Sequence, residues 1–264
     1  PSPPLLSETP ATNPLNEVTD LPSLKTYAAS LNPAVKYFDP LSLSTRSFWS
    51  ADNVLSESSI FTLPPGVTGN SRTISWLRHA EIKHGRVAMA AFVGWCVQAN
   101  GIHFPWSLTL DGSNPSYAAG LSPPEQWDAL PEVAKYQLAL VIGFLEFWGE
   151  GGGNSFAEGG QKTTPHYTKK DGLPGQYPPF DLFRESIHPV PFNLYDPFGF
   201  SKNMSVERAQ RGLKAEVNNG RLAMIGIFGF VTESKIHGSV PFIEGFVKHY
   251  DGEFMAPFMK GIGA

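Results

Sequence analysis

Two stretches of the sequence decide the fold: EIKHGRVAMAAFVG at residues 81–94 and EVNNGRLAMIGIFG at residues 216–229. They align without gaps at an offset of 135, and 6 of 14 positions are identical, including the glutamate and the arginine. Small residues recur at every third position of both copies: Gly85, Ala88, Ala91 and Gly94, then Gly220, Ala223, Gly226 and Gly229. Two helices with matching stripes of small residues can cross at close range, because no bulky side chain holds their backbones apart.

Each copy of the repeat places a glutamate five residues before an arginine, in a mostly apolar segment. If a twofold axis relates the two helices, Glu81 reaches Arg221 whenever Glu216 reaches Arg86. We therefore expect two buried interhelical ion pairs, and removing one partner of a pair would cost about 3–5 kcal/mol. Such a pair enters an apolar environment as a neutral unit, so ordinary hydropathy underestimates a membrane span that contains it.

The repeats lie in the first and third of three long helices that the sequence predicts, at about residues 71–99, 132–149 and 205–234. All three segments lack proline. The Asn-Gly pair at residues 100–101 is expected to end the first helix, and Ser205 is expected to cap the third. No uncharged apolar run reaches the roughly 18 residues that mark a simple membrane span.

The remaining segments predict a domain organisation around these helices. Residues 1–70 are rich in Pro, Ser and Thr and predict an extended N-terminal arm. Residues 71–250 form the three-helix domain and residues 251–264 a C-terminal tail, with one short amphipathic helix expected around Phe242–Tyr250. The connection at residues 151–204 lacks a clear period, which indicates that something other than a protein core organises it.

Composition excludes several classes of protein. The 264 residues carry a net charge of −4 without a dense basic cluster, so no nucleic-acid partner is expected. The single Cys96 cannot form an internal disulfide. The sequence holds no HExxH, CxxC or EF-hand pattern for a metal ion bound by protein alone. The glycines at residues 151–153 follow a helix and match no phosphate loop, and no catalytic constellation is present, so we expect no enzyme.

Three residues after each glutamate of the repeat stands another Lewis base, His84 in the first copy and Asn219 in the second. This spacing puts the two donors of each copy on one helix face. Magnesium that is already held in a porphyrin-like dianion needs only one axial ligand, which should be neutral. A histidine, an asparagine and a glutamate neutralised by arginine all meet that requirement.

The motifs EIKHGRVAM and EVNNGRLAM resemble the two signature helices of light-harvesting chlorophyll a/c antennae of red-lineage algae, the fucoxanthin or peridinin chlorophyll a/c type of the chlorophyll a/b-binding superfamily. Upstream of each motif lies a matching segment, FDPLSL at residues 38–43 and YDPFGF at residues 195–200. The resemblance covers roughly Tyr37 to His249. It implies an all-α membrane protein with three transmembrane helices, of which the first and third cross about a pseudo-twofold axis, and with long irregular loops.

The resemblance also implies pigment ligands and cofactors. Its chlorophyll ligands are Glu81, His84, Gln137, Glu146, Glu216, Asn219, Glu233 and His249. The glutamates, the histidine and the asparagine of the repeat would bind chlorophyll magnesium directly, while Arg86 and Arg221 would form structural ion pairs. The cofactors would be chlorophyll a, chlorophyll c and a xanthophyll such as peridinin, fucoxanthin or diadinoxanthin, with carotenoid ends held by the two DP segments.

Simpler interpretations of the same residues remain open. The Glu–Arg pairs could be an interhelical lock without ligands, and His84 could be a core histidine. Gln137 and Glu146 have no counterpart in a repeat. The remaining histidines are expected to be loop or helix-end residues rather than ligands: His79, His103, His166, His188 and His237.

The distribution of basic residues predicts the topology. Residues 100–130 contain no Lys or Arg, whereas basic residues precede both repeat helices. By the positive-inside bias the N-terminal ends of these helices face the stroma and the loop faces the lumen. We interpret the chain as a multi-pass antenna of the chloroplast thylakoid membrane, bound by thylakoid lipids, neighbouring antenna subunits and a photosystem core, photosystem I favoured over II. The alternatives are a member that dissipates excitation energy and a pigment-poor structural linker.

Overall fold

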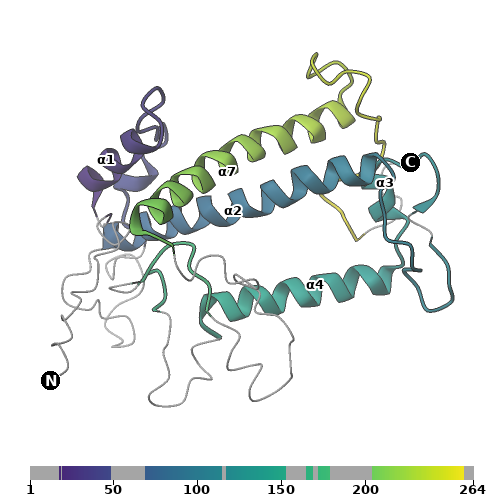
Figure 1. Ribbon diagram of the computed structural model, residues 1–264, viewed down its shortest axis with the longest axis horizontal. Helices are drawn as coiled ribbons and strands as arrows, with labels where there is room; N and C mark the ends of the chain where they lie inside the picture. The colour runs from purple at the N-terminus through teal and green to yellow at the C-terminus, as the bar shows by residue number, and fades with distance from the viewer. Residues whose placement is uncertain are drawn as a thin grey trace, which may run out of the picture. The chain divides into compact units, whose positions relative to one another are not determined.

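The computed structural model describes residues 18, 20–48, 69–114, 117–152, 165–168, 172–178 and 204–258. Within these ranges the chain is helical and no strand occurs, as expected. The helices are α1 (Leu21–Leu31), α2 (Gly69–Ala99), α3 (Pro123–Asp128), α4 (Glu132–Phe147) and α7 (Val206–Lys235), with a 3₁₀ turn η1 (Leu43–Thr45) and a π-helical turn η4 (Trp148–Gly152) (Figure 1). None of the described helices is both long enough and apolar enough to cross a membrane.

The three long helices begin and end close to the predicted residues. The Asn-Gly pair ends α2 as expected, because Gly101 adopts a left-handed φ of +65°. The Gly101 N–H then donates to the Gln98 carbonyl (3.0 Å) and the Ile102 N–H to the Val97 carbonyl (3.2 Å). This double closure is the Schellman motif, and it directs the chain after α2 sharply away from the helix axis.

The ends of α7 are fixed by side chains. The Ser205 hydroxyl oxygen accepts the Arg208 N–H at 3.3 Å, which confirms the predicted N-terminal cap. At the other end the buried Glu233 carboxylate accepts the backbone N–H groups of Gly238 (2.9 Å) and Val240 (2.7 Å). Glu233 thereby closes the turn that follows the helix.

The arm at residues 1–70 is not wholly extended, contrary to the prediction. Residues Leu21–Leu31 form α1, because Asp20 and Ser23 build a reciprocal capping box and Pro22 stands in the first turn. Ala28 and Leu31 are buried, so the helix has an apolar side after all.

The short helix expected around Phe242–Tyr250 is also absent; residues 248–250 have no regular structure, and turns extend only to residue 246. Gly245 lies among them with a φ of +83°, a conformation that no right-handed helix contains.

The chain divides into two compact units: Pro1–Lys83 with Gly149–Ala215, and His84–Trp148 with Glu216–Ala264. Helices α2 and α7 each contribute to both units. In the first unit the Arg78 guanidinium lies 4.7 Å from the centre of the Tyr27 ring, which attaches α1 to α2.

A loop of the first unit is organised around one carboxylate, in the FDPLSL segment. Asp39 accepts the backbone N–H groups of Leu43 and Ser44 (both 2.9 Å), the Ser44 hydroxyl (2.7 Å) and the Tyr37 hydroxyl (2.9 Å). Desolvation opposes ionisation of Asp39, but these hydrogen bonds outweigh it and lower its pKa to about 2. The matching segment at residues 195–200 lies outside the described residues, as does His188.

A second carboxylate fastens the described part of the long connection to α2. Glu150 in η4 lies 3.3 Å from the Lys83 ammonium and 3.1 Å from both the His166 ring and the Tyr167 hydroxyl. The Tyr167 ring stacks on His79 of α2 at a centroid distance of 4.0 Å. Residues 165–168 are thus held by protein contacts, whereas the sequence predicts that something other than a protein core organises this connection.

In the second unit α2 and α7 cross through their glycines, and Figure 1 shows the two helices side by side. A Cβ atom built on Gly220 would lie 2.8 Å from the Cα of Gly85, and one built on Gly85 would lie 3.0 Å from the Cα of Gly220. The predicted close crossing is therefore confirmed. The stripe is not used throughout, because Gly94 and Gly229 have no atom within 4 Å of such a Cβ.

Gly220→Ala should destabilise the protein by about 1–3 kcal/mol, because the added methyl group meets backbone atoms of Gly85 that cannot rotate away. Gly229→Ala is the matched control on the same helix: its methyl group enters open space and should stabilise by up to about 1 kcal/mol through helix propensity. Thermal unfolding followed by circular dichroism compares the two variants. Equal stability of both would contradict a close crossing at Gly220.

Acidification should open the Asp39 loop selectively. Because folding lowers the pKa of Asp39 to about 2, its contribution to stability is complete above the unfolded value of 3.8 and is lost as the pH falls towards 2. Hydrogen exchange of the Leu43 and Ser44 amides, corrected for intrinsic pH dependence, should accelerate by about tenfold or more across that window. Asp39→Asn should remove this pH dependence; a variant that keeps it would show that another group is responsible.

Candidate functional site

An ion pair joins the two copies of the repeat. The Arg86 Nε atom lies 2.6 Å from Oε1 of Glu216, which confirms one of the two predicted pairs. The side chains are 43% and 26% exposed, so the pair is less buried by protein than predicted. Glu81 and Arg221 fall in different units, and their pairing stays a prediction.

Equivalent positions of the repeat have equivalent surroundings. Gly85 and Gly220 are buried at the crossing, whereas their preceding neighbours, His84 and Asn219, are exposed. Each copy therefore turns its glycine towards the other helix and its nitrogen or oxygen donor outwards. Within the described part of the chain the Asn219 amide has no hydrogen-bond partner.

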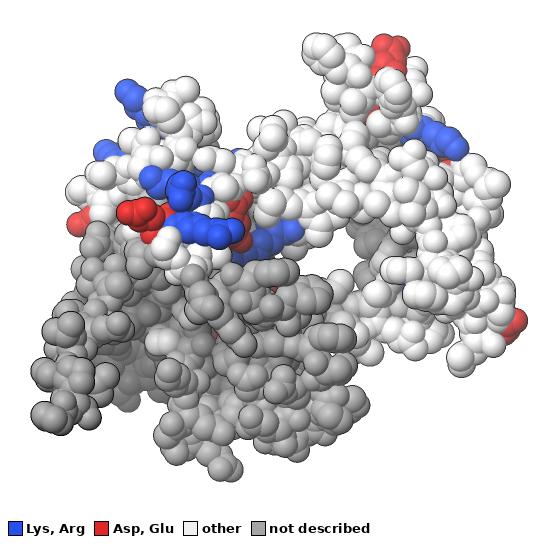
Figure 2. All heavy atoms as spheres, viewed as in Figure 1, with Lys and Arg blue, Asp and Glu red and all other residues white. Residues whose placement is uncertain are grey.

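Large apolar side chains stand beside these donors. One turn after His84 lies Val87, which is 65% exposed, and one turn after Asn219 lies Leu222, which is 69% exposed. On the face shown in Figure 2, charged side chains gather near the N-terminal ends of α2 and α7, and the surface further along these helices is largely uncharged. Exposed apolar side chains such as Val87 and Leu222 on this uncharged surface indicate a site that something apolar covers.

Helix α4 carries two further predicted ligands, Gln137 and Glu146, both exposed. Its burial pattern is inverted: Lys135 is 2% exposed, while Leu140 is 74% exposed. Its exposed large apolar residues are Val133, Tyr136, Leu138, Leu140, Val141, Ile142, Phe144 and Phe147. The buried Lys135 ammonium donates to the Asp128 carbonyl at 3.4 Å. Within the described part of the chain, these side chains of α4 have no apolar cover.

The last two predicted ligands lie near the end of α7. Both carboxylate oxygens of Glu233 accept hydrogen bonds from the following turn, and His237 Nδ1 lies 3.2 Å from one of them. His249 is exposed, and its Nε2 lies 2.9 Å from a carboxylate oxygen of Asp251.

The donor set fits a ring cofactor that brings its own metal. The described residues contain no group of three or more His, Cys, Asp or Glu that could hold a metal ion. Instead, single donors such as Asn219 and Gln137 stand alone on apolar helix surfaces. One axial ligand and a broad apolar contact are what a magnesium chlorin requires of a protein.

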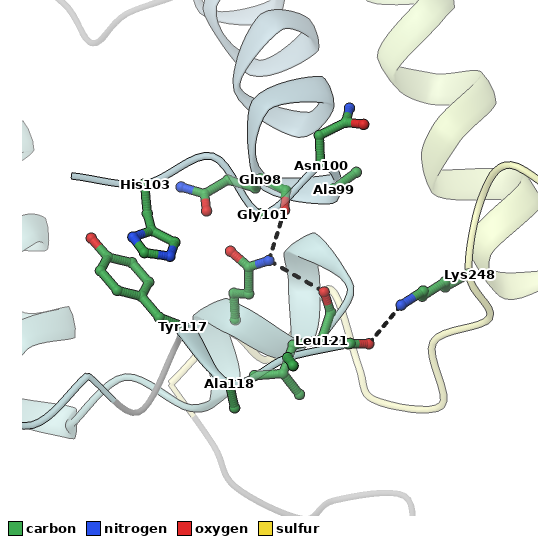
Figure 3. Close-up of a pocket in the computed structure, with 12 residues that line it drawn as sticks. Gln98, Ala99, Asn100, Gly101, His103, Tyr117, Ala118, Leu121 and Lys248 are labelled. Atoms are coloured by element: carbon green, nitrogen blue, oxygen red, sulfur yellow. Dashed lines mark hydrogen bonds between the residues drawn. The ribbon is translucent and has the colours of Figure 1, made fainter. Parts of the chain in front are cut away.

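The sequence predicts His79, His103 and His166 to be loop or helix-end residues rather than ligands. This is wrong for His79, which is buried within α2. In the structure His79 and His166 contact Glu150, and His103 lines a pocket at the end of α2 (Figure 3). The sequence could have indicated this position of His103. The Asn-Gly pair at residues 100–101 predicts a sharp turn, which brings the histidine that follows back beside the end of α2.

Residues 24–235 match the family described as Chlorophyll A-B binding protein, and the chain belongs to this family. It is 29% identical over 217 residues to fucoxanthin-chlorophyll a-c binding protein F of Phaeodactylum tricornutum, covering 79% of this chain and 93% of the relative. It is 28% identical over 171 residues to a fucoxanthin-chlorophyll a-c binding protein of Trieres chinensis, covering 63% and 68%. A chloroplastic protein of the same name from Chattonella marina var. antiqua is 29% identical over 204 residues, covering 76% and 73%.

The Arg86–Glu216 pair should show a favourable coupling of more than about 1 kcal/mol, the upper limit for most ion pairs exposed to water. Arg86→Leu leaves the Glu216 carboxylate without its cation, so combining it with Glu216→Gln should recover stability. Thermal unfolding of the wild type, both single variants and the double variant measures this coupling. If the double variant loses the sum of the single losses, the two residues do not interact.

Proposed function

We propose that this protein is a light-harvesting antenna that holds chlorophylls a and c and a xanthophyll such as fucoxanthin, and passes excitation energy to a photosystem. The observation that carries the proposal is the placement of single neutral donors on exposed apolar helix surfaces, as with Asn219 beside Leu222. The relatives named fucoxanthin-chlorophyll a-c binding proteins support the same pigments.

In this proposal the residues of the chain bind and orient the pigments and carry out no bond chemistry. Bound chlorophyll would supply the absorption of light. His84, Asn219 and Gln137 would each offer one neutral donor to a magnesium. Arg86, 2.6 Å from Glu216, would neutralise that carboxylate and so make it an acceptable axial ligand. Glu81, with Arg221, would repeat this arrangement, and Glu146 and His249 are further ligands in the proposal.

We assign Glu233 to the turn rather than to a pigment. The residue is 1% exposed and its carboxylate accepts two backbone N–H groups, so approach of a chlorin to its oxygens would first have to open that turn.

The proposal places α2, α4 and α7 across the thylakoid membrane. Neutralisation of Glu216 by Arg86 lowers the cost of carrying charge into the bilayer, and exposed apolar residues such as Leu140 would meet lipid or pigment. Basic residues near the N-terminal ends of α2 and α7 favour the stromal side for these ends (Figure 2). The proposed partners are thylakoid lipids, neighbouring antenna subunits and a photosystem core, with photosystem I preferred.

Extraction of pigments from the purified protein tests this function. Several chlorophylls per chain, with fluorescence lifetimes of nanoseconds, would support a harvesting antenna. Very short lifetimes with the same pigment content would indicate a member that dissipates excitation, and one chlorophyll or none per chain would indicate a structural linker.

Asn219→Leu should remove one chlorophyll and leave the helical fold intact, because the side chain loses its oxygen donor on an exposed position. Asn219→His is the matched control: it copies His84 from the first repeat and should keep the chlorophyll. Pigment stoichiometry after reconstitution measures both. An unchanged count in the leucine variant would assign Asn219 a purely structural role.

A further inference from the structure

The loop that follows α2, at residues 102–110, is apolar on its outside. Its sequence, IHFPWSLTL, contains no Asp, Glu, Lys or Arg. Its large apolar side chains are all exposed: Ile102, Phe104, Trp106, Leu108 and Leu110. Single exposed apolar side chains are common on protein surfaces, but a contiguous group of them marks a surface that contacts a partner or a membrane.

The polar groups of this loop bind one another. The Ser107 hydroxyl donates to the Gly112 carbonyl at 3.2 Å, and the Leu108 N–H donates to the side-chain oxygen of Asn114 at 2.7 Å. Polar groups that are already paired cost little when they leave water, whereas unpaired ones cost much more. The loop can therefore enter a medium that contains little water.

His103 holds the first part of the loop against the protein. Its ring stacks on the Tyr117 ring with a centroid distance of 4.0 Å and an interplanar angle of 14°, and Figure 3 shows the two rings side by side. The His103 Nδ1 atom also lies 3.1 Å from the Phe104 carbonyl oxygen. With His103 held in this way, its exposed neighbours Ile102 and Phe104 remain available for an outside contact.

Two aromatic rings give the loop a surface suited to lipid. The Phe104 and Trp106 rings stack with a centroid distance of 4.5 Å and an interplanar angle of 11°. Among the described residues none accepts a hydrogen bond from the Trp106 indole N–H. A ring with an apolar body and an available N–H fits the boundary between acyl chains and head groups, where tryptophan is enriched.

The length of α2 places the loop at this boundary if α2 crosses the membrane as proposed. Its 31 residues span about 46 Å, against about 30 Å for the hydrocarbon core and about 40–45 Å for the bilayer with its head groups. The apolar half of the helix, residues 87–97, is the half next to the loop. The Ile102 N–H bonds back to the Val97 carbonyl at 3.2 Å, so the loop begins beside the last turn of α2.

The chain after α7 has exposed apolar residues at the same end of the second unit. Ile236 directly follows the helix, and Phe242 and Phe246 lie in the turns beyond it. The Lys248 ammonium donates to the Gly120 carbonyl at 2.8 Å, which joins this segment to the chain that follows the loop. Apolar side chains beyond the ends of both crossing helices form a belt, which fits a surrounding lipid boundary better than one bound protein.

We propose that the loop Ile102–Leu110 lies in the boundary between lipid head groups and acyl chains, on the side of the membrane where α2 ends. The inference rests on the proposed function, which places α2 across the membrane. It goes beyond the expectation that this loop faces the lumen, because Phe104, Trp106 and Leu110 then contact lipid instead of water.

Spin labels on single cysteines test the position of the loop in the full pigmented chain, reconstituted into phosphatidylcholine vesicles. Cys96→Ser removes the native thiol. Leu110→Cys then carries the label in the loop, and Asp251→Cys is the aqueous reference, because the Asp251 side chain is 93% exposed. Power saturation compares collisions with oxygen, which concentrates in lipid, and with a water-soluble nickel complex. The oxygen-to-nickel ratio at residue 110 should exceed that at residue 251 by at least about fivefold.

Two other results at residue 110 would overturn the inference. A ratio equal to that at residue 251 would place the loop in water, and a label that neither reagent reaches would place it against protein. A wild-type measurement avoids any effect of the substitutions: a photoreactive diazirine carried on a lipid acyl chain should label residues 102–110, and no adduct there would also overturn the inference. Removal of the wild-type chain from the vesicles by alkaline carbonate would instead contradict the proposed membrane placement.

Discussion

The contact between Gly85 and Gly220 determines the arrangement of the second unit. Because neither residue has a Cβ atom, the two helix backbones approach until one more carbon would lie within 3.0 Å of the facing Cα. At that separation Arg86 reaches Glu216 with a short ion pair. The residues just before the glycines, His84 and Asn219, then have no room inside and must face outwards. One steric constraint thus sets both the charge pairing and the direction of the donors.

The exposed apolar faces of α2, α4 and α7 show that burial of protein against protein does not alone stabilise this fold. Helix α4 buries a lysine and exposes most of its large apolar residues, the reverse of the pattern in a water-soluble core. Apolar pigments and lipids would supply the missing contacts, and their binding energy would then belong to the folding energy. In the proposed function, the ligands that absorb light would also complete the core.

The sequence was sufficient where the repeat provided the information. It predicted α2, α7, their crossing at the glycines and the Arg86–Glu216 pair. It did not predict α1, because a reciprocal cap between Asp20 and Ser23 outweighs a proline-rich context. Its prediction of a helix around residues 242–250 was wrong, because the apolar pattern does not reveal that Gly245 adopts a positive φ. The contact between the His103 ring and the Phe104 carbonyl depends on the loop conformation after α2, which no residue pattern encodes.

The most direct measurement is a cryo-electron microscopy map of the pigmented protein at a resolution that separates axial ligands. The account predicts planar ring density against the exposed faces of α2, α4 and α7, with magnesium about 2.1 Å from the donor atoms of His84 and Asn219. Faces covered only by lipid or by another protein chain, with these donors hydrogen-bonded to protein, would contradict the central claim that single outward donors on the crossing helices hold the pigments.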